Sequence, residues 1–195
     1  YKGSFDKYIK DPKRKKGTSE VDKEFLKQID NWRIELAKNI ALRNKNLSIH
    51  DLNFAVQKII DRIIFLRIAE DRGMEDYATL QKMTEEKNTR YQIYQELLKY
   101  FKKADDKYNS GLFDFKEDKI TQKLTIDHKI FNEIIKDLYY PHSPYEFSVL
   151  PIEILGNIYE QFLGKTIRLT PGHLAKVEEK PEVRKAGGVY YTPQY

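Results

Sequence analysis

Residues 48–73, "SIHDLNFAVQKIIDRIIFLRIAEDRG", decide the fold of this chain. Apolar side chains recur every three or four positions along them, which is the spacing of one face of an α-helix. The main stripe consists of Leu52, Val56, Ile59, Ile63 and Leu66. Four more apolar residues widen the stripe almost around the helix: Ile60, Ile64, Phe65 and Ile68. Because a helix that is apolar on most faces must be buried, this segment is predicted to lie at the centre of a helical bundle.

Both ends of this segment carry capping signals. Ser48 stands where an N-cap hydroxyl accepts a backbone N–H, and Gly73 stands where a helix commonly ends in the left-handed conformation. Near the carboxyl end, Arg67 precedes Glu70 by three residues and Asp71 by four, a spacing that allows ion pairs along one helix face. The sequence therefore predicts a helix over residues 48–73 whose charges pair along its surface. Because they lie near the end of a buried helix, these charges are expected to pair with neighbouring elements rather than to be catalytic.

An amphipathic helix is predicted before the central one, from about residue 18 to residue 43. Its apolar residues are again three or four positions apart: Phe25, Ile29, Trp32, Leu36 and Ile40. Thr18 and Ser19 have side chains suited to capping its first turn. The stripe predicts one buried face along this helix.

Shorter helices are predicted after the central one. Turn residues at 109–111 interrupt the helical pattern, and residues 112–115 then supply an apolar anchor. Asp127 is expected to cap the next helix, and Pro151 is expected to start the last one. The predicted helices cover residues 77–83, 89–106, 127–140 and 151–163.

The C-terminal part of the chain loses the helical pattern. Residues 165–180 place β-branched and polar side chains on both sides of Pro171-Gly172, which predicts a two-stranded hairpin. The pair Gly187-Gly188 indicates an extended linker. The predicted fold class is therefore mainly α: a multi-helix bundle over residues 18–163, with a small hairpin and an extended linker over residues 164–188.

The composition excludes several classes of protein. The chain has 195 residues, of which 40% are hydrophobic and 13% are aromatic, and this excludes a disordered chain. It contains no apolar run of about 18 residues, so no membrane-spanning helix is predicted. The absence of cysteine removes disulfides and thiolate metal sites, and it is typical of an intracellular protein. We therefore expect a cytoplasmic protein with no membrane partner.

Basic residues gather near the two ends of the chain, although its net charge is only +5. Residues 7–16 hold six basic side chains and one acidic one, and residues 164–188 hold six basic and three acidic ones. Such clusters neutralise phosphates, although they are also typical of a solvated surface. We expect contacts with a nucleic-acid backbone from Lys13, Arg14, Lys15, Lys16, Arg168, Arg184 and Lys185.

The residues of the chain itself indicate no active site. None of its four histidines has a histidine partner three or four positions away, so no zinc site is predicted. The sequence has neither a P-loop nor a G-x-G-x-x-G motif. Residues 85–87 and 178–180 each match the Glu-x-Lys of metal-dependent nucleases, but the first lies in a helical region and the second lacks an upstream Pro-Asp. We predict no catalytic residue and no metal ligand.

Four stretches of the chain carry a family resemblance: "FAVQKIIDRIIFLRIAEDRG" (54–73), "NSGLFDF" (109–115), "VLPIEILGNIYEQFLGKTIRLTP" (149–171) and "KPEVRKAGGVYYTPQY" (180–195). In this order they resemble the middle of large bifunctional restriction-modification proteins, the single-chain type IIG enzymes and their relatives. They are also similar to the methyltransferases of some phage-defence systems. The resemblance covers residues 18–195, and the order of the stretches, with "GGVYYTP" last, makes it specific.

The resemblance implies a layout. In this family an N-terminal nuclease, which uses Mg²⁺, is followed by a helical connector. A class I methyltransferase then transfers a methyl group from S-adenosylmethionine to the exocyclic amine of adenine in DNA, and a target-recognition domain follows. Residues 1–17 would then be the basic tail of the nuclease region, and residues 189–195 the start of the methyltransferase. The family's Thr-Pro turn lies over the cofactor, so the implied cofactor-binding residues are Tyr191, Thr192 and Pro193.

Several motifs of the family do not occur in this chain. They are the Asp-Pro-x-x-Gly-x-Gly cofactor loop, the catalytic Asn-Pro-Pro-Tyr and the nuclease Pro-Asp…Glu-x-Lys. We therefore expect an excised, non-catalytic part of a longer enzyme, which meets DNA through its parent and binds no cofactor alone. Two alternatives stay open. One is a free-standing helical module whose basic arms bind nucleic acid or acidic proteins, and the other is an independent metal-dependent nuclease.

Overall fold

The computed structural model describes residues 12–85, 92–143, 145–149, 156, 160 and 164–180, and within these it leaves out the side chains of residues 12–22, 85 and 149. The elements in chain order are α2 (Pro12–Arg43), α3 (Ile49–Asp71), α4 (Thr79–Glu85), α5 (Gln92–Tyr108), the 3₁₀ turn η1 (Thr121–Lys123), α6 (His128–Lys136), the 3₁₀ turn η2 (Phe147–Val149), β1 (Lys165–Leu169) and β2 (Ala175–Glu179). The predicted fold class, mainly α with a small C-terminal hairpin, is confirmed.

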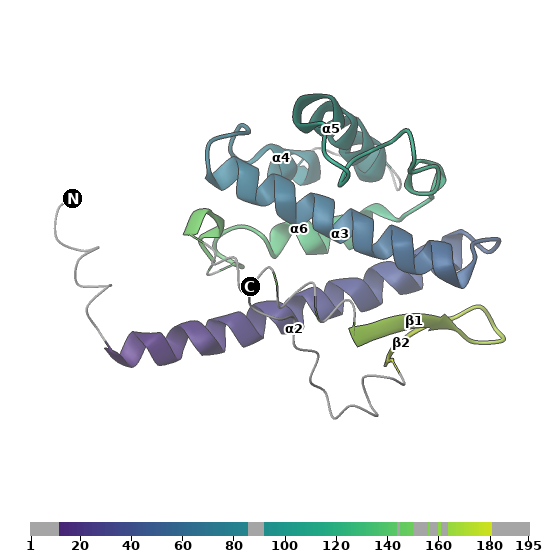
Figure 1. Cartoon of the computed structure of the whole chain (residues 1–195), viewed down its shortest axis with the longest axis horizontal. Coiled ribbons are helices and arrows are strands. Elements are labelled where there is room, and N and C mark those ends of the chain that lie inside the picture. Colours follow the sequence, from purple (N-terminus) through teal and green to yellow (C-terminus); the bar gives the residue numbers. More distant parts are fainter. Residues whose placement is uncertain are drawn as a thin grey trace.

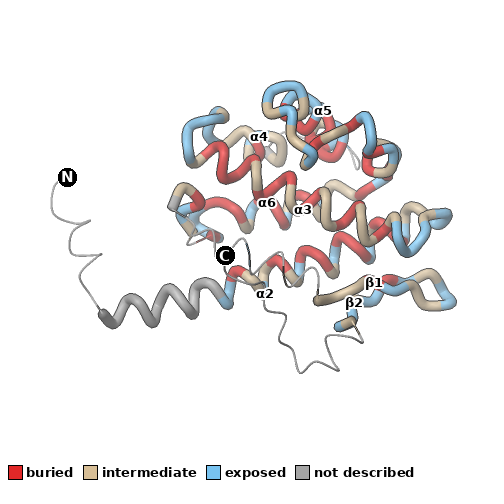
Figure 2. Tube along the Cα trace, in the orientation of Figure 1, coloured by how far each residue is buried: buried red, intermediate tan, exposed pale blue. Residues whose placement is uncertain are grey.

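Helix α3 runs through the middle of the bundle, as its apolar pattern predicts (Figure 1). Helices α4 and α5 lie on one side of α3 and α2 lies on the other, while β1, η1 and η2 also contact it. All five residues of its main stripe are buried, and so are Ile60, Ile64 and Ile68. Figure 2 shows the buried residues concentrated on α3 and on the parts of its neighbours that face it. One continuous core therefore forms around this helix.

Both predicted caps of α3 are confirmed. The Ser48 hydroxyl accepts the backbone N–H of Asp51 at 3.0 Å. Gly73 has φ +69°, and its N–H bonds to the carbonyl of Glu70 at 3.0 Å. The N–H of Met74 reaches back to the carbonyl of Ala69 at 2.8 Å. This pair of bonds is a Schellman motif, which satisfies carbonyls that the helix end would otherwise leave unpaired.

The predicted pairing of Arg67 with Asp71 and with neighbouring elements is confirmed, but these charges are buried rather than at the surface. Arg67 is 4% exposed and Glu70 is 2% exposed. The Arg67 guanidinium pairs with Asp71 and donates through Nε to the carbonyl of Leu138 at 3.0 Å. These charges are covered because α4 and the chain after α6 fold over this end of α3, which its own helical spacing does not reveal.

Glu70 joins three parts of the chain. Its carboxylate accepts the backbone N–H of Ala78 at 3.2 Å, the N–H of Leu80 at 3.0 Å and the hydroxyl of Tyr139 at 2.5 Å. Ala78 and Leu80 flank the first residue of α4, so Glu70 supplies the acceptor that orphan N–H groups at a helix start require. Burial raises the pKa of Glu70, and the bonds from Tyr139 and Leu80 and the charge of Arg67 only partly offset this.

Arg62 anchors the loop between α5 and η1. It is fully buried, and its guanidinium donates to the carbonyls of Leu112 at 3.0 Å and Phe113 at 2.6 Å. It also bonds to the hydroxyl of Thr121 at 3.0 Å and pairs with Asp118 at 2.8 Å. Residues 111–121 contain no α-helix, so this one side chain satisfies polar groups that would otherwise be buried unpaired.

Helix α2 confirms the predicted stripe but begins earlier than predicted. All five stripe residues are buried, from Phe25 at 1% exposure to Ile40 at 0%. The helix starts at Pro12, so the backbone of Thr18 and Ser19 lies inside it, and the prediction that they cap it was wrong. Proline suits the first helical position because its ring presets φ and the missing N–H has no partner there in any case.

The shorter helices agree with their predicted positions to within a few residues. The segments predicted as helices over 77–83 and 89–106 form α4 and α5, and α6 ends at Lys136 rather than at residue 140. Asp127 occupies the N-cap position of α6 but makes no capping bond with its side chain. Its carboxylate instead accepts from Asn39 and Arg43 of α2. Most of the helix predicted over 151–163 lies outside the described residues.

Candidate functional site

Half of the ten predicted site residues fall outside the residues that the structure describes. These are the cofactor-binding residues Tyr191, Thr192 and Pro193 and the basic residues Arg184 and Lys185. In the described ranges, no group of three or more His, Asp or Glu side chains is placed to hold a metal ion. None of the described helices is long and apolar enough to cross a membrane.

The remaining predicted DNA contacts lie on two separate elements. The backbone of Lys13, Arg14, Lys15 and Lys16 forms the first turns of α2, at the end of that helix that extends beyond the bundle (Figure 1). Arg168 lies on β1, exposed, with its guanidinium 3.4 Å from the carboxylate of Glu178 on β2. The structure therefore places these two basic sets toward opposite ends of α2 and does not combine them into one surface.

The hairpin is the described element that leads toward the predicted cofactor-binding residues. Strands β1 and β2 are antiparallel, with Ile167 opposite Val177 and Leu169 opposite Ala175, which confirms the predicted hairpin. Cross-strand bonds join Gly164 to Lys180 and Thr170 to Leu174. Bonded pairs alternate along an antiparallel ladder, so the backbone N–H and C=O of Ile167 point away from β2.

Asn53 of α3 closes this outer edge of β1. Its side-chain amide donates to the carbonyl of Ile167 at 2.8 Å, and its amide oxygen accepts the Ile167 N–H at 2.8 Å. Ile167 is fully buried, so no solvent replaces these bonds. The amide thus pairs with β1 as another strand would. We use the name hairpin latch for these two bonds together with the contacts of Arg33 and Lys165, which are described next.

Helix α2 supplies the second half of the hairpin latch. Arg33, which is 4% exposed, donates through Nη2 to the carbonyl of Lys165 at 3.0 Å. The ammonium of Lys165 in turn pairs with Asp30, one turn before Arg33. Burial lowers the pKa of Arg33, and the nearby Asp30 carboxylate partly offsets this effect. Two helices therefore hold the first strand of the hairpin at two successive outward-facing positions.

Two asparagines, Asn39 on α2 and Asn44 directly after it, bond to another extended segment in the same way. Asn39 of α2 accepts the N–H of Asp127 at 3.0 Å and donates to its carboxylate at 2.7 Å. Asn44 accepts the N–H of Thr125 at 2.9 Å and donates to its carbonyl at 2.9 Å. The sequence analysis missed these residues. One signal in the sequence could have pointed to two of them. Asn39 and Asn53 stand inside strongly helical segments, although asparagine has a low intrinsic helix propensity.

The geometry supports a mechanical role for the described residues. The bonds of the hairpin latch, the asparagine bonds and the ion pairs of Arg62 and Arg67 all form within the chain. They fix the position of the hairpin relative to the bundle, and a two-stranded hairpin is only marginally stable by itself. These contacts therefore hold the hairpin in a defined position against the bundle.

Comparison with known proteins identifies one relevant similarity. The chain is 39% identical over 182 residues to the type II restriction enzyme and methyltransferase RM.Eco57I of Escherichia coli. This alignment includes 93% of the chain but only 18% of that protein, so the chain spans less than a fifth of its length. No family model matches the chain, and no solved structure matches it. The resemblance to bifunctional restriction-modification proteins that the four sequence stretches predict is confirmed.

Proposed function

This chain is homologous to a segment of a bifunctional restriction-modification enzyme, and we propose that it is the helical connector between the nuclease and the adenine-specific DNA methyltransferase of such a protein. The observation that supports this role most directly is the hairpin latch. A connector must keep the domains on its two sides at a fixed distance and orientation. The bonds of Asn53, Arg33 and Lys165 hold the hairpin, the last described element, against α2 and α3, the two longest helices of the bundle. The connector itself carries out no chemistry.

The parent's cofactor chemistry is assigned on the resemblance. Tyr191, Thr192 and Pro193 follow the hairpin and are proposed to form one side of the S-adenosylmethionine site of the parent. A hydroxyl and free backbone N–H groups beside a helix start suit the carboxylate of the cofactor's methionine end. The remaining walls of that site would come from the parent protein. Mg²⁺ would serve the nuclease alone, and DNA would be the substrate of both catalytic domains.

The hairpin latch can be tested in this chain by the distance between two spin labels. The chain contains no cysteine, so Lys99→Cys on α5 and Leu174→Cys at the exposed tip of the hairpin allow specific labelling. We expect Asn53→Ala to broaden the distance distribution clearly, because two bonds to buried backbone groups are lost at about 1–3 kcal/mol for each unpaired group. Asn39→Ala is the matched control, since it removes an equivalent pair of bonds at α6 and should leave the distribution narrow. An unchanged distribution in Asn53→Ala would contradict the role of the hairpin latch.

The same two variants test the connector role in a longer parent that cuts DNA. If the bundle sets the spacing between the cutting and methylating sites, Asn53→Ala should spread the cut positions measured from the methylated adenine. Asn39→Ala should leave the cut positions where they are in the unmodified parent. Identical cut-site distributions for Asn53→Ala and the unmodified parent would refute the connector role, even if the labels report a loosened hairpin.

Contact between DNA and the start of α2 is tested by salt dependence. Neutralising Lys13, Arg14, Lys15 and Lys16 to glutamine should weaken duplex binding and reduce the slope of log K against log salt concentration by up to about 4, since each phosphate contact contributes about 0.9. The matched control neutralises Lys99 and Lys129, which are exposed and already paired with Glu96 and Glu133. An equal slope in the fourfold variant and the unmodified chain would exclude these contacts.

A further inference from the structure

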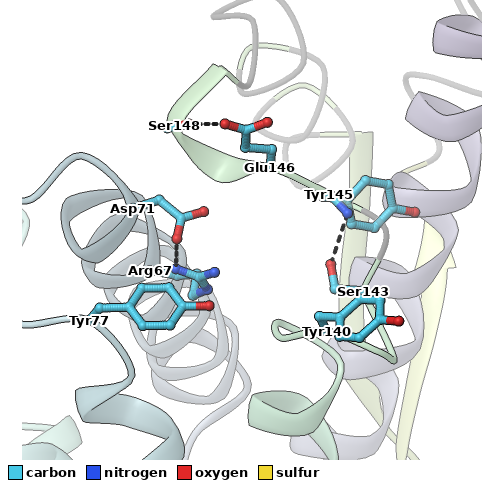
Figure 3. Close-up of a pocket in the computed structure, with 8 residues that line it drawn as sticks. All are labelled: Arg67, Asp71, Tyr77, Tyr140, Ser143, Tyr145, Glu146 and Ser148. Atoms are coloured by element: carbon cyan, nitrogen blue, oxygen red, sulfur yellow. Dashed lines mark hydrogen bonds and ion pairs between the residues drawn. The ribbon is translucent and has the colours of Figure 1, made fainter. Parts of the chain in front are cut away.

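A cavity opens at the carboxyl end of α3, away from the hairpin latch (Figure 3). It has a volume of about 300 Å³. One wall comes from the end of α3 and the turn after it, with Arg67, Asp71 and Tyr77, and the facing wall comes from the chain after α6, with Tyr140 and Ser143. Arg168, the predicted DNA contact whose side chain the structure describes, does not line this cavity. We call it the tyrosine pocket.

Two exposed aromatic rings flank the tyrosine pocket. Tyr77 is 60% exposed and Tyr140 is 86% exposed, which makes them the two most exposed aromatic residues among the large hydrophobic ones of the described chain. The Tyr77 ring is held in place by an edge contact with Tyr139, at 6.2 Å between ring centroids, and by the guanidinium of Arg67 at 5.4 Å. Tyrosines of this kind are enriched where proteins bind one another.

The charges on the α3 wall are already paired within the chain. Arg67 is bound to Asp71 and to the carbonyl of Leu138. The second carboxylate oxygen of Asp71 accepts the N–H of Phe147 at 2.9 Å. Glu70 lies behind Arg67 at 3.8 Å. The positive charge of Arg67 is therefore balanced by carboxylates of the chain itself. It gives the pocket no net attraction for an anion.

Glu146 carries the one charge in the lining that forms no ion pair with a described residue. Its side chain is exposed, and its carboxylate accepts only the hydroxyl of Ser148, at 3.0 Å, among the hydrogen bonds seen in the described chain. No described lysine or arginine forms an ion pair with it. The lining residues thus combine the Arg67–Asp71 ion pair, the Glu146 carboxylate and three tyrosine rings, of which those of Tyr77 and Tyr140 are exposed.

We propose that the tyrosine pocket binds one arginine side chain presented by another protein segment. A guanidinium is planar, stacks on aromatic rings and forms two parallel hydrogen bonds to a carboxylate, so Tyr77, Tyr140 and Glu146 match all of its features. The volume lies at the lower limit of pockets that bind whole small molecules, which suits a single side chain. The phosphates of DNA or of a nucleotide would meet the charge of Glu146, so nucleic acid is disfavoured there.

The probe for this proposal is the blocked peptide N-acetyl-Gly-Arg-Gly-amide, titrated into the isotope-labelled chain. The backbone amides of Tyr145 and Phe147 report on the pocket by NMR, because they bond to Ser143 and Asp71 in its lining. We expect saturable shifts of both signals, weakened about fivefold or more by Glu146→Gln, which removes a charge-assisted pair. Tyr140→Ala should weaken binding as well, and both positions are exposed enough that the fold is retained.

Matched controls distinguish specific binding of the arginine peptide in the tyrosine pocket from non-specific attraction of the peptide to negative charges on the protein. Glu133→Gln removes an exposed carboxylate on α6 that pairs with Lys129 at 3.8 Å, and it should leave the affinity unchanged. The same peptide with norleucine in place of arginine should cause no saturable shift. Equal binding of the norleucine peptide, or equal affinity in Glu146→Gln, would overturn the proposal. Shifts caused by adenosine monophosphate and not by the arginine peptide would identify a nucleotide site instead.

Discussion

Replacing Arg62 with alanine is expected to lower the free energy of unfolding by about 4–5 kcal/mol, the largest effect we expect from any single substitution in this chain. For a chain of this size the midpoint of thermal unfolding should fall by about 10–15 °C. The reason is that Arg62 is fully buried and serves several acceptors at once. Without it, the carbonyls of Leu112 and Phe113 lose their side-chain donor, and the buried carboxylate of Asp118 loses the opposite charge that pairs with it.

The measurement is urea unfolding of the variant and the unmodified chain, followed by circular dichroism. Lys58→Ala is the matched control, because Lys58 bonds to the carbonyl of Gly111 in the same loop but from an exposed position. It should cost less than about 1 kcal/mol. An Arg62→Ala variant as stable as Lys58→Ala would show that the buried guanidinium does not hold the loop.

The pH dependence gives a second check on this pair. Burial alone would raise the pKa of Asp118, but the Thr121 hydroxyl and N–H and the Arg62 guanidinium outweigh it and leave the pKa below its usual value. Because the folded-state pKa is depressed, this contribution to stability is present above the unfolded-state pKa and is lost as pH falls through the folded-state value. In Arg62→Ala we expect this acid-dependent loss to become smaller.

Replacing Glu70 with alanine is expected to lower the free energy of unfolding by about 3–4 kcal/mol. The carboxylate accepts the N–H groups of Ala78 and Leu80 and the Tyr139 hydroxyl, and all three donors lose their partner together. The Arg67 guanidinium also loses a carboxylate that lies 3.8 Å away. Urea unfolding measures the total cost, and hydrogen exchange at Leu80 should show that the start of α4 opens first. Unchanged exchange at Leu80 would contradict the capping role of Glu70.

Glu70→Gln is the matched variant for the charge of this side chain. The glutamine side chain keeps one acceptor oxygen. At low pH we therefore expect Glu70→Gln to lower the free energy of unfolding by about half as much as Glu70→Ala does. Because burial raises the pKa of Glu70, its favourable contribution is present below the ordinary glutamate pKa and is lost as pH rises through the raised folded-state value. The difference between the unmodified chain and Glu70→Gln should therefore shrink from acid to neutral pH, and a difference that grows would contradict the raised pKa.

The apolar pattern predicted the helices because burial of a periodic stripe depends mainly on local spacing. The stripes of α2 and α3 are buried as predicted, and the signals at Ser48 and Gly73 cap α3 as predicted. A capping residue in the sequence predicted the wrong contact where another element bonds to its side chain. Asp127 stands at an N-cap position, but Asn39 and Arg43 of α2 take its carboxylate.

The candidate site was predicted less well than the fold. The resemblance pointed to residues after the hairpin, whereas the hairpin latch depends on Asn53, Arg33 and Lys165, which no motif singled out. A sequence shows that an asparagine is polar and disfavoured inside a helix, but not which strand will come within hydrogen-bond distance of it. The tyrosine pocket has the same origin, because Tyr77 and Tyr140 come to lie on facing walls of one cavity only when the chain after α6 folds onto the end of α3.

The sequence by itself determined the mainly helical class, the central position of α3, the hairpin and the relationship to restriction-modification enzymes. These follow from periodicity, turn residues and motif order, all of which are local properties of the chain. Only the tertiary structure decided that Arg62, Arg67 and Glu70 are buried and that Asn53 pairs with Ile167. The physical reason is that the burial of a charge and the partner of an amide depend on distant segments, which come into contact only when the bundle has formed.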